Sequence, residues 1–240
     1  MRSFNKMSEV FDLLNHNKIN YAVLRNYENL LDDQIYMTGH GDVDLICDDS
    51  LKLAKVIGAM PQDFHTKKEK HDGVHFSINI KNNAVSLDLR YIGDRYYCSK
   101  WQTEMLNRRV IFNSFYVLGK EDYFYTLVYH AIYQKPILTE EYRNRLIGMA
   151  KNLSLNIVNN KPKDFIILLE SYMKKNHYVY QYPKDKYVPF NSTFVQDKSL
   201  LNFCFDDYYK NKLFHLKVSA IDKLVSIKHF IENNLTKKQL

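Results

Sequence analysis

Three aspartates in the first half of the sequence have the spacing of a carboxylate cluster. Asp42 and Asp44 stand two positions apart in the segment DVDLIC, and Asp88 lies in VSLDLR. Alternate side chains of a strand point to one side, so Asp42 and Asp44 share a face, and a neighbouring strand can bring Asp88 beside them. Carboxylates are the ligands that Mg²⁺ prefers, together with substrate phosphates. The pattern predicts Mg²⁺ or Mn²⁺ held by Asp42, Asp44 and Asp88, with these acids catalysing an in-line phosphoryl displacement.

The residues around the acids support this prediction and also admit a simpler one. Gly39 and Gly41 stand before the acids in TGHGDVDLIC, where glycine lets the backbone approach a phosphate closely, and a plain turn into a strand is the alternative. Arg90 follows Asp88 by two positions on the same face, and it could bind phosphate or form an ion pair with one of the acids. Because clustered carboxylates repel one another, we expect at least one to bind a proton more readily than a free aspartate.

Alternating and helical periods indicate the elements that position these residues. Apolar alternation predicts strands, and a spacing of three to four predicts helices. The expected strands cover 19–24, 42–47, 74–80 and 84–91, the last two joined as a hairpin, and the expected helices cover 4–14, 51–60, 121–135, 165–172 and 213–231. The fold class is therefore α+β, with a mixed sheet and its helices in residues 1–118 and a mostly helical lobe in residues 119–240.

The second half offers candidate substrate ligands on one predicted helix. His130 and Gln134 are four positions apart, so they face the same way, with Lys135 next to them. If the helical lobe closes over the first, His130 and Lys135 can reach a base or a phosphate. The alternative is a histidine satisfied inside the core. His71 and His75 are not on a helix, and no cysteine lies near them, so a zinc pair is not favoured.

The order of these elements resembles the minimal nucleotidyltransferases of the DNA polymerase β-like superfamily. The resemblance covers about residues 5–95: a helix, the strand YAVLRN, a Gly-rich turn, DVDL, a helix, a hairpin and VSLDLR. It implies that the three aspartates hold Mg²⁺ and assist attack on an NTP. Where that superfamily has a Gly-Ser or Gly-Gly motif, this chain has Arg25 and Asn26, which could supply charge and a donor to the phosphates. The segments GDRYYCSKWQTEMLNRR and EDYFYTLVYHAIYQK resemble nucleotidyltransferase-like proteins of bacterial surface-polysaccharide or small-molecule pathways.

Three kinds of function remain open at this point. The first is Mg²⁺-dependent transfer of a nucleotidyl group from an NTP to a hydroxyl or phosphate of a small molecule or glycan precursor. The second is a phosphotransferase that uses a nucleotide-activated donor. The third is a non-catalytic nucleotide- or RNA-binding module. The partners expected are therefore a nucleotide and a small-molecule or glycan acceptor.

The composition indicates which partners and which cellular compartment to expect. The 240 residues carry a formal charge of +7, which favours anionic partners, but the basic runs are short and typical of solvated faces, so nucleic acid is a minor alternative. The three cysteines form no CxxC pair, which is typical of a reducing compartment, and we expect a cytoplasmic protein. No apolar run is long enough to span a membrane. The sequence does not determine the oligomeric state.

Overall fold

The structure is a computed structural model, and it describes most of the chain. The described residues are 2–32, 36, 42–62, 73–157, 161–185, 187–202, 209, 212–214, 216–217 and 220. Gly39, His40, Gly41 and His71 lie outside them, as does most of the helix expected over 213–231. Within the described part, no helix is both long and apolar enough to cross a membrane.

The fold is α+β, as the sequence predicts, and its centre is one mixed sheet. In the described residues the strands are β1 (Ser3–Phe4), β2 (Tyr21–Val23), β3 (Val43–Cys47), β4 (Met60–Pro61), β5 (His75–Ile80), β6 (Asn83–Tyr91), β7 (Val110–Phe112) and β8 (Phe115–Val117). Their order is β1-β5-β6-β3-β2-β8-β7, with β4 also paired to β5. The pairs β3–β6, β1–β5 and β2–β8 are parallel, and the other pairs are antiparallel.

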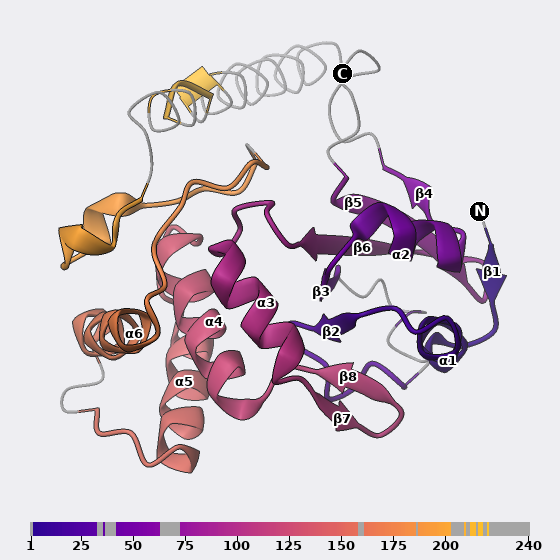
Figure 1. Cartoon of the computed structure of the whole chain (residues 1–240), viewed down its shortest axis with the longest axis horizontal. Helices are drawn as coiled ribbons and strands as arrows, with labels where there is room; N and C mark the ends of the chain where they lie inside the picture. Colours follow the sequence, from indigo (N-terminus) through magenta and orange to yellow (C-terminus); the bar gives the residue numbers. More distant parts are fainter. Residues whose placement is uncertain are drawn as a thin grey trace, which may run out of the picture.

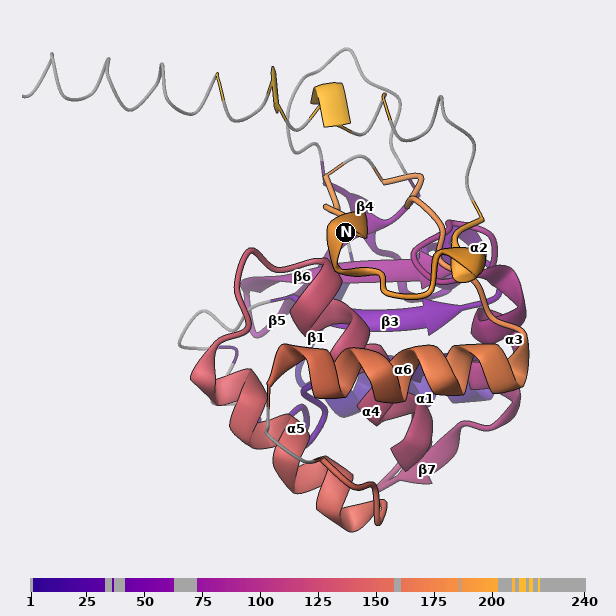
Figure 2. The ribbon, with the colours of Figure 1, turned by 90° about the vertical axis from the view of Figure 1, so that its left-hand side faces the viewer.

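Helices cover both faces of the sheet. They are α1 (Met7–His16), α2 (Ser50–Ile57), α3 (Ser99–Asn107), α4 (Lys120–Tyr133), α5 (Glu140–Asn152) and α6 (Pro162–Asn176), followed by short 3₁₀ turns η2 (Ser192–Phe194) and η3 (Lys198–Leu200). Figure 1 shows α4, α5 and α6 to one side of the strands and α1 on the other. In Figure 2, α5 and α6 lie with α4, against which both pack.

The strands place successive side chains in two separate cores. Val23 and Leu45 pack with α1 and α2, whereas Ala22 and Ile46 pack with the helices from α3 onward. Since side chains alternate along a strand, Asp44 shares the face of Ile46, which is the face toward α3 and α4. The core on this side runs from the sheet into α4, α5 and α6 without interruption, and the division into two domains stays a prediction.

The hairpin predicted between residues 74 and 91 is confirmed. β5 and β6 pair in antiparallel register, with Ile80 opposite Asn83. The turn residues Lys81 and Asn82 have φ of 48° and 67°, as expected for a two-residue turn that matches the twist of the strands. This register fixes which side chains of β6 face the helices.

The helix predicted over 51–60 begins as expected and ends earlier. The Asp49 side chain accepts a hydrogen bond from the Lys52 backbone N–H and so caps the first turn. The helix ends at Ile57 because Gly58 adopts the left-handed conformation, with φ of 63°. Pro61, predicted to end the helix, lies in β4 instead.

The helix expected over 121–135 is α4, and it is buried on nearly all sides rather than along one apolar face only. Nearly every side chain from Asp122 to Tyr133 is buried, with His130 half-buried. A helix that is apolar on all sides belongs inside a protein, which explains why α4 lies between the sheet and the outer helices.

Candidate functional site

Asp44 and Asp88 lie side by side in the centre of the sheet. They are register partners on the parallel strands β3 and β6, so their side chains project from the same face about 4.8 Å apart along the sheet. Figure 2 shows the two strands running together. His75 on β5 is the register partner of Asp88 on its other side. The sheet therefore sets one histidine and two aspartates in a row, facing α3 and α4.

Asp42 lies at the edge of this row. It directly precedes β3 and its side chain is exposed, whereas Asp44 is buried. Burial is the main cause of the raised pKa of Asp88, and the charge of Asp42 adds a small part to it. The structure thus brings two of the three predicted acids together in the interior and leaves the third at the surface beside them.

Arg25 is the counter-ion of Asp44. Its Nε and Nη2 donate to the two carboxylate oxygens at 2.8 and 2.6 Å, a bidentate pair in which the side chains are only 8% and 11% exposed. Burial opposes ionisation of Asp44, but the guanidinium more than offsets it and holds the pKa of Asp44 below its usual value. The prediction that Arg25 serves the substrate phosphates is untested, and in this structure its hydrogen bonds go to Asp44.

Asp88 is held by a different set of partners. Arg90 Nη2 donates to it at 3.3 Å, and His75 Nε2 lies 3.6 Å away. Arg90 Nη1 also donates to Asp185 at 2.9 Å, which brings a second buried acid to the cluster from the segment after α6. Burial raises the pKa of Asp88, and the nearby charge of Asp44 adds to this effect. The raised pKa of Asp88 has the direction expected for clustered carboxylates, but its main cause is burial and the repulsion by Asp44 is a smaller one.

Tyr96 connects the two arginines. Its hydroxyl accepts from Arg25 Nη2 at 3.1 Å, and the Arg90 guanidinium lies over its ring, 4.3 Å from the ring centre. A cation over an aromatic face is stabilised by the ring quadrupole, more so when both are removed from water. Tyr96 therefore contacts both guanidinium groups beside the acids, Arg25 through its hydroxyl and Arg90 through its ring.

His130 reaches the edge of this network from α4. Its Nδ1 lies 3.0 Å from Gln134 Oε1 and 3.4 Å from the Tyr96 hydroxyl. The first contact confirms that His130 and Gln134 face together. Burial, followed by the charge of Arg25, lowers the pKa of His130 to about 3, so the ring is neutral at physiological pH. A neutral imidazole can donate or accept a hydrogen bond but offers no positive charge to a phosphate. Lys135, one position beyond Gln134, is exposed.

Asn26 faces away from the acids. It has φ of 56°, and its Oδ1 accepts from Arg145 Nη1 of α5 at 2.6 Å. Its backbone N–H donates to the Tyr123 hydroxyl at 3.2 Å. The consecutive residues Arg25 and Asn26 thus turn to opposite sides of the chain, one to the buried acids and the other to α5.

The donor chemistry of Asp44 and Asp88 fits a magnesium ion shared with a ligand, though not an all-protein cage. Among the described residues, no group of three histidine, cysteine or acidic side chains is arranged to hold a metal. Mg²⁺ is commonly held by one or two carboxylates together with substrate phosphates, which this pair of hard oxygen ligands can supply. Each oxygen of Asp44 accepts one hydrogen bond from Arg25 and keeps a second lone pair, so the guanidinium competes with a cation for this carboxylate without blocking it.

Three members of the network were not predicted from the sequence. Asp185 lies in an irregular segment without a motif, Tyr96 belongs to the segment GDRYYCSKWQTEMLNRR but was not singled out within it, and His75 was considered only as a partner for His71. The register of His75 with Asp88 follows from the hairpin turn at Lys81 and Asn82, so counting back from that turn would have found it.

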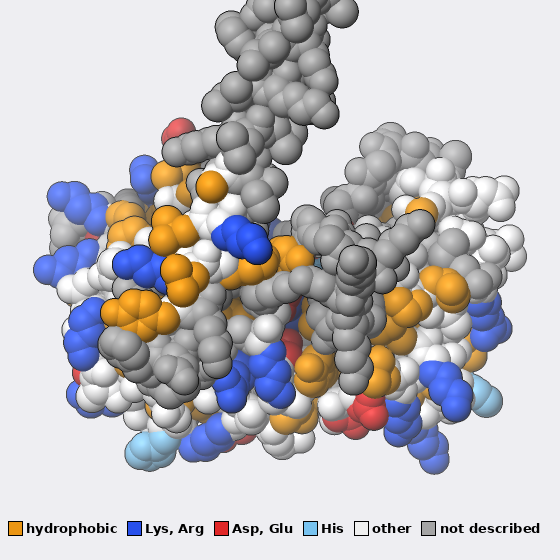
Figure 3. All heavy atoms as spheres, turned by 90° about the horizontal axis from the view of Figure 1, so that it is seen from above, with side chains coloured by type: hydrophobic (Ala, Val, Ile, Leu, Met, Phe, Trp, Pro, Cys, Tyr) orange, Lys and Arg blue, Asp and Glu red, His pale blue; other side chains and the backbone are white. Residues whose placement is uncertain are grey.

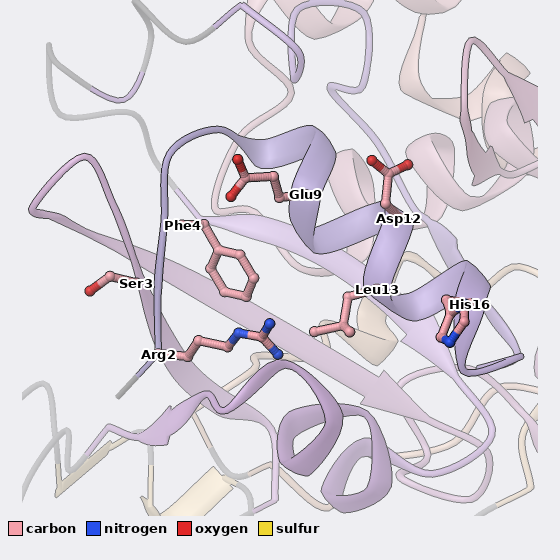
Figure 4. Close-up of a pocket in the computed structure, with 7 residues that line it drawn as sticks. All are labelled: Arg2, Ser3, Phe4, Glu9, Asp12, Leu13 and His16. Carbon is pink, nitrogen blue, oxygen red and sulfur yellow. The ribbon is translucent and has the colours of Figure 1, made fainter.

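Two cavities lie apart from the buried acids. One, of about 420 Å³, is bordered by Arg2, Glu9, Asp12 and His16 beside β1 and α1 (Figure 4). The other, of about 370 Å³, lies between the chain after β2 and helix α5. On the face seen in Figure 3, Lys and Arg side chains are spread widely rather than gathered in one patch.

No family model matches the chain, and no curated protein is detectably similar to it in sequence. An antigenic nucleotidyltransferase-like protein from Paracoccidioides brasiliensis has a solved structure that is 12% identical over 71% of this chain and 89% of its own, with a TM-score of 0.37. The structure of JHP933 from Helicobacter pylori is 15% identical over 96% of this chain and 94% of its own, with a TM-score of 0.36.

Proposed function

We propose that the chain transfers a nucleotidyl group from a nucleoside triphosphate to a hydroxyl or phosphate of a small molecule or glycan precursor, with Mg²⁺ or Mn²⁺. The observation that carries the proposal is the in-register placement of Asp44 and Asp88 on adjacent parallel strands, with arginines on either side. A buried and a partly buried acid, paired beside guanidinium groups, suit a ligand that brings both phosphates and a cation. Asp42, Asp44 and Asp88 would hold the metal, which would supply charge stabilisation to the phosphates.

The residues of the chain have separate roles in this proposal. The acceptor oxygen forms a bond to the α-phosphorus as the bond to pyrophosphate breaks, and the acceptor proton passes to Asp88. A carboxylate whose pKa is raised by burial is a better proton acceptor than a free one. Arg90 holds Asp88 in position through its hydrogen bond. Arg25, which binds Asp44 in the free protein, would bind a phosphate of the donor in place of that carboxylate. His130 on α4 and Lys135, two residues beyond the end of that helix, would contact the donor.

The decisive experiment measures product and pyrophosphate together. The purified protein is incubated with each NTP, Mg²⁺ or Mn²⁺, and a panel of sugars, sugar phosphates and polyols, and nucleotidylated products are identified by mass spectrometry. We expect one donor and acceptor pair to give equal amounts of product and pyrophosphate. Asp88→Asn should lower the rate by a factor of about 100 or more, whereas Asp12→Asn, the same change at an exposed position on α1, should not.

A second candidate is a non-catalytic nucleotide-binding module. It is favoured by the ion pairs themselves, because Arg25 already satisfies both oxygens of Asp44 and Arg90 binds both Asp88 and Asp185. In that case an NTP would stabilise the protein against heat without any product. A product from a nucleotide-activated sugar or alcohol, with none from NTPs, would instead indicate the related phosphotransferase.

A further inference from the structure

The cavity of about 370 Å³ beside α5 is built from three separate parts of the chain. Tyr27 follows β2, Tyr123 belongs to the first turns of α4, and one face of α5 supplies the remaining wall. On that face Asn144, Gly148 and Asn152 are spaced four positions apart, so they form one continuous stripe. The cavity has the volume of a pocket for a small ligand.

Arg145 organises the polar side of this cavity. Its guanidinium donates to Asn26 Oδ1 at 2.6 Å, to Glu28 Oε1 at 3.3 Å and to the Tyr123 hydroxyl, and it lies 5.4 Å from the centre of the Tyr123 ring. Held by several partners, this side chain loses little further freedom when a ligand binds. Asn26 is adjacent to Arg25, which binds Asp44, so residues 25–26 have the cavity on one side and the acids on the other.

The walls offer both donors and acceptors around an aromatic surface. Glu28 accepts hydrogen bonds, Lys120 and Arg145 donate them, and the amides of Asn144 and Asn152 do both. A hydroxyl group also does both, so several neighbouring hydroxyls match such a wall better than an apolar ligand would. With two cations and one carboxylate lining it, the cavity carries one excess positive charge.

The two tyrosines discriminate between ligand classes. The rings of Tyr27 and Tyr123 pack on one another, with centroids 5.1 Å apart and planes tilted by 44°. No slot is therefore left between them for a planar base. Tyr123 is almost fully buried, so the ring surface open to a ligand is that of Tyr27, which suits the C–H face of a sugar ring packed on one side of it.

We propose that this cavity binds the acceptor, a monosaccharide-sized polyol that carries one anionic substituent such as a phosphate or carboxylate. The proposal rests on the proposed function for the reaction, but the binding itself does not require that function.

Gly148 provides the test, because a side chain added there has room to enter the cavity. A Cβ at this position meets no atom within 4 Å. Gly148→Leu therefore places an isobutyl group between Asn144 and Asn152 on the cavity wall, while the helix is retained. Lys151→Leu is the matched control, since Lys151 is exposed on the same helix and does not line the cavity.

Isothermal titration is carried out with glucose 1-phosphate, glucuronic acid, N-acetylglucosamine 1-phosphate, the methyl glycosides of the neutral sugars, and inorganic phosphate. We expect saturable binding of at least one anionic sugar. Its dissociation constant should rise at least tenfold in Gly148→Leu and change less than twofold in Lys151→Leu and in Asp88→Asn. Circular dichroism melting curves establish that the variants are folded.

Three results would overturn the proposal: none of these sugars binds the unaltered protein, Gly148→Leu binds them as well as the control, or inorganic phosphate binds as tightly as the sugar phosphates. Retained binding in Asp88→Asn separates this proposal from the proposed function. A chain that binds an anionic sugar in a Gly148-dependent manner and shows no transfer would support the cavity assignment and contradict the reaction.

Discussion

The ion pair between Arg25 and Asp44 allows the sharpest test of the site. Arg25→Gln removes two charge-assisted hydrogen bonds and leaves a carboxylate that is 11% exposed without its counter-ion. Breaking one partner of a buried pair costs about 3–5 kcal/mol, because the remaining charge is left in a low-dielectric setting. For a chain of this size that corresponds to a fall in melting temperature of about 6–20 °C.

The matching double variant isolates the interaction from other effects of the substitution. Arg25→Gln with Asp44→Asn replaces the two charges by neutral groups, so it should be at least about 2 kcal/mol more stable than the sum of the two single changes predicts. Unfolding in urea is followed by the fluorescence of Trp101, the one tryptophan in the chain, which is fully buried. Lys52→Gln, which removes an exposed positive charge, should change stability by less than about 0.5 kcal/mol.

The same variant separates the internal counter-ion from an external one. In Arg25→Gln neither oxygen of Asp44 is bound by the guanidinium, so both are open to a divalent cation. Mg²⁺ at about 10 mM should therefore raise the melting temperature of Arg25→Gln more than that of the unaltered protein. If Arg25→Gln is as stable as the unaltered protein within about 1 kcal/mol, the account of Arg25 as the counter-ion of Asp44 is refuted. The same account is refuted independently if the destabilisation of the double variant equals the sum of the two single effects.

Four further outcomes are expected. The pKa of His130 is about 3 in the folded protein and 6.5 in a free histidine, so its contribution to the free energy of unfolding is present above pH 6.5 and is lost as pH falls. The free energy of unfolding in urea should therefore drop by about 2 kcal/mol between pH 7.5 and 5, and this part of the drop should vanish in His130→Asn. The pKa of Asp88 is raised in the folded protein, so its contribution to the free energy of unfolding is lost as pH rises through that pKa. Between pH 4 and 7, Asp88→Asn should therefore lose less stability than the unaltered protein in the same assay. Asp185→Asn weakens a buried charged hydrogen bond of 2.9 Å to Arg90 and should cost about 2 kcal/mol in urea unfolding. Gly148→Ala, in a helix with open space around it, should raise stability by about 0.5–1 kcal/mol in thermal unfolding.

The sequence by itself determined those features that depend on neighbours along the chain. The alternation in VSLDLR places Asp88 and Arg90 on the face opposite Leu87 and Leu89, because successive side chains of a strand point to opposite faces, and the structure confirms it. The turn at 81–82 fixed the hairpin register in the same way. Local conformational preferences also gave the start of α2, whereas its end depended on Gly58 rather than on Pro61.

Only the tertiary structure decided which charges neutralise which. Arg25 and Asp44 are 19 positions apart, and Arg90 and Asp185 are 95 apart, so no periodicity relates them. Whether an arginine beside an acid serves a ligand or pairs with that acid depends on burial, since an ionised group removed from water requires a partner. The packing of α4 and the segment after α6 over the sheet removes that water, and this is why the acids predicted from DVDLIC and VSLDLR occur as buried ion pairs with arginine.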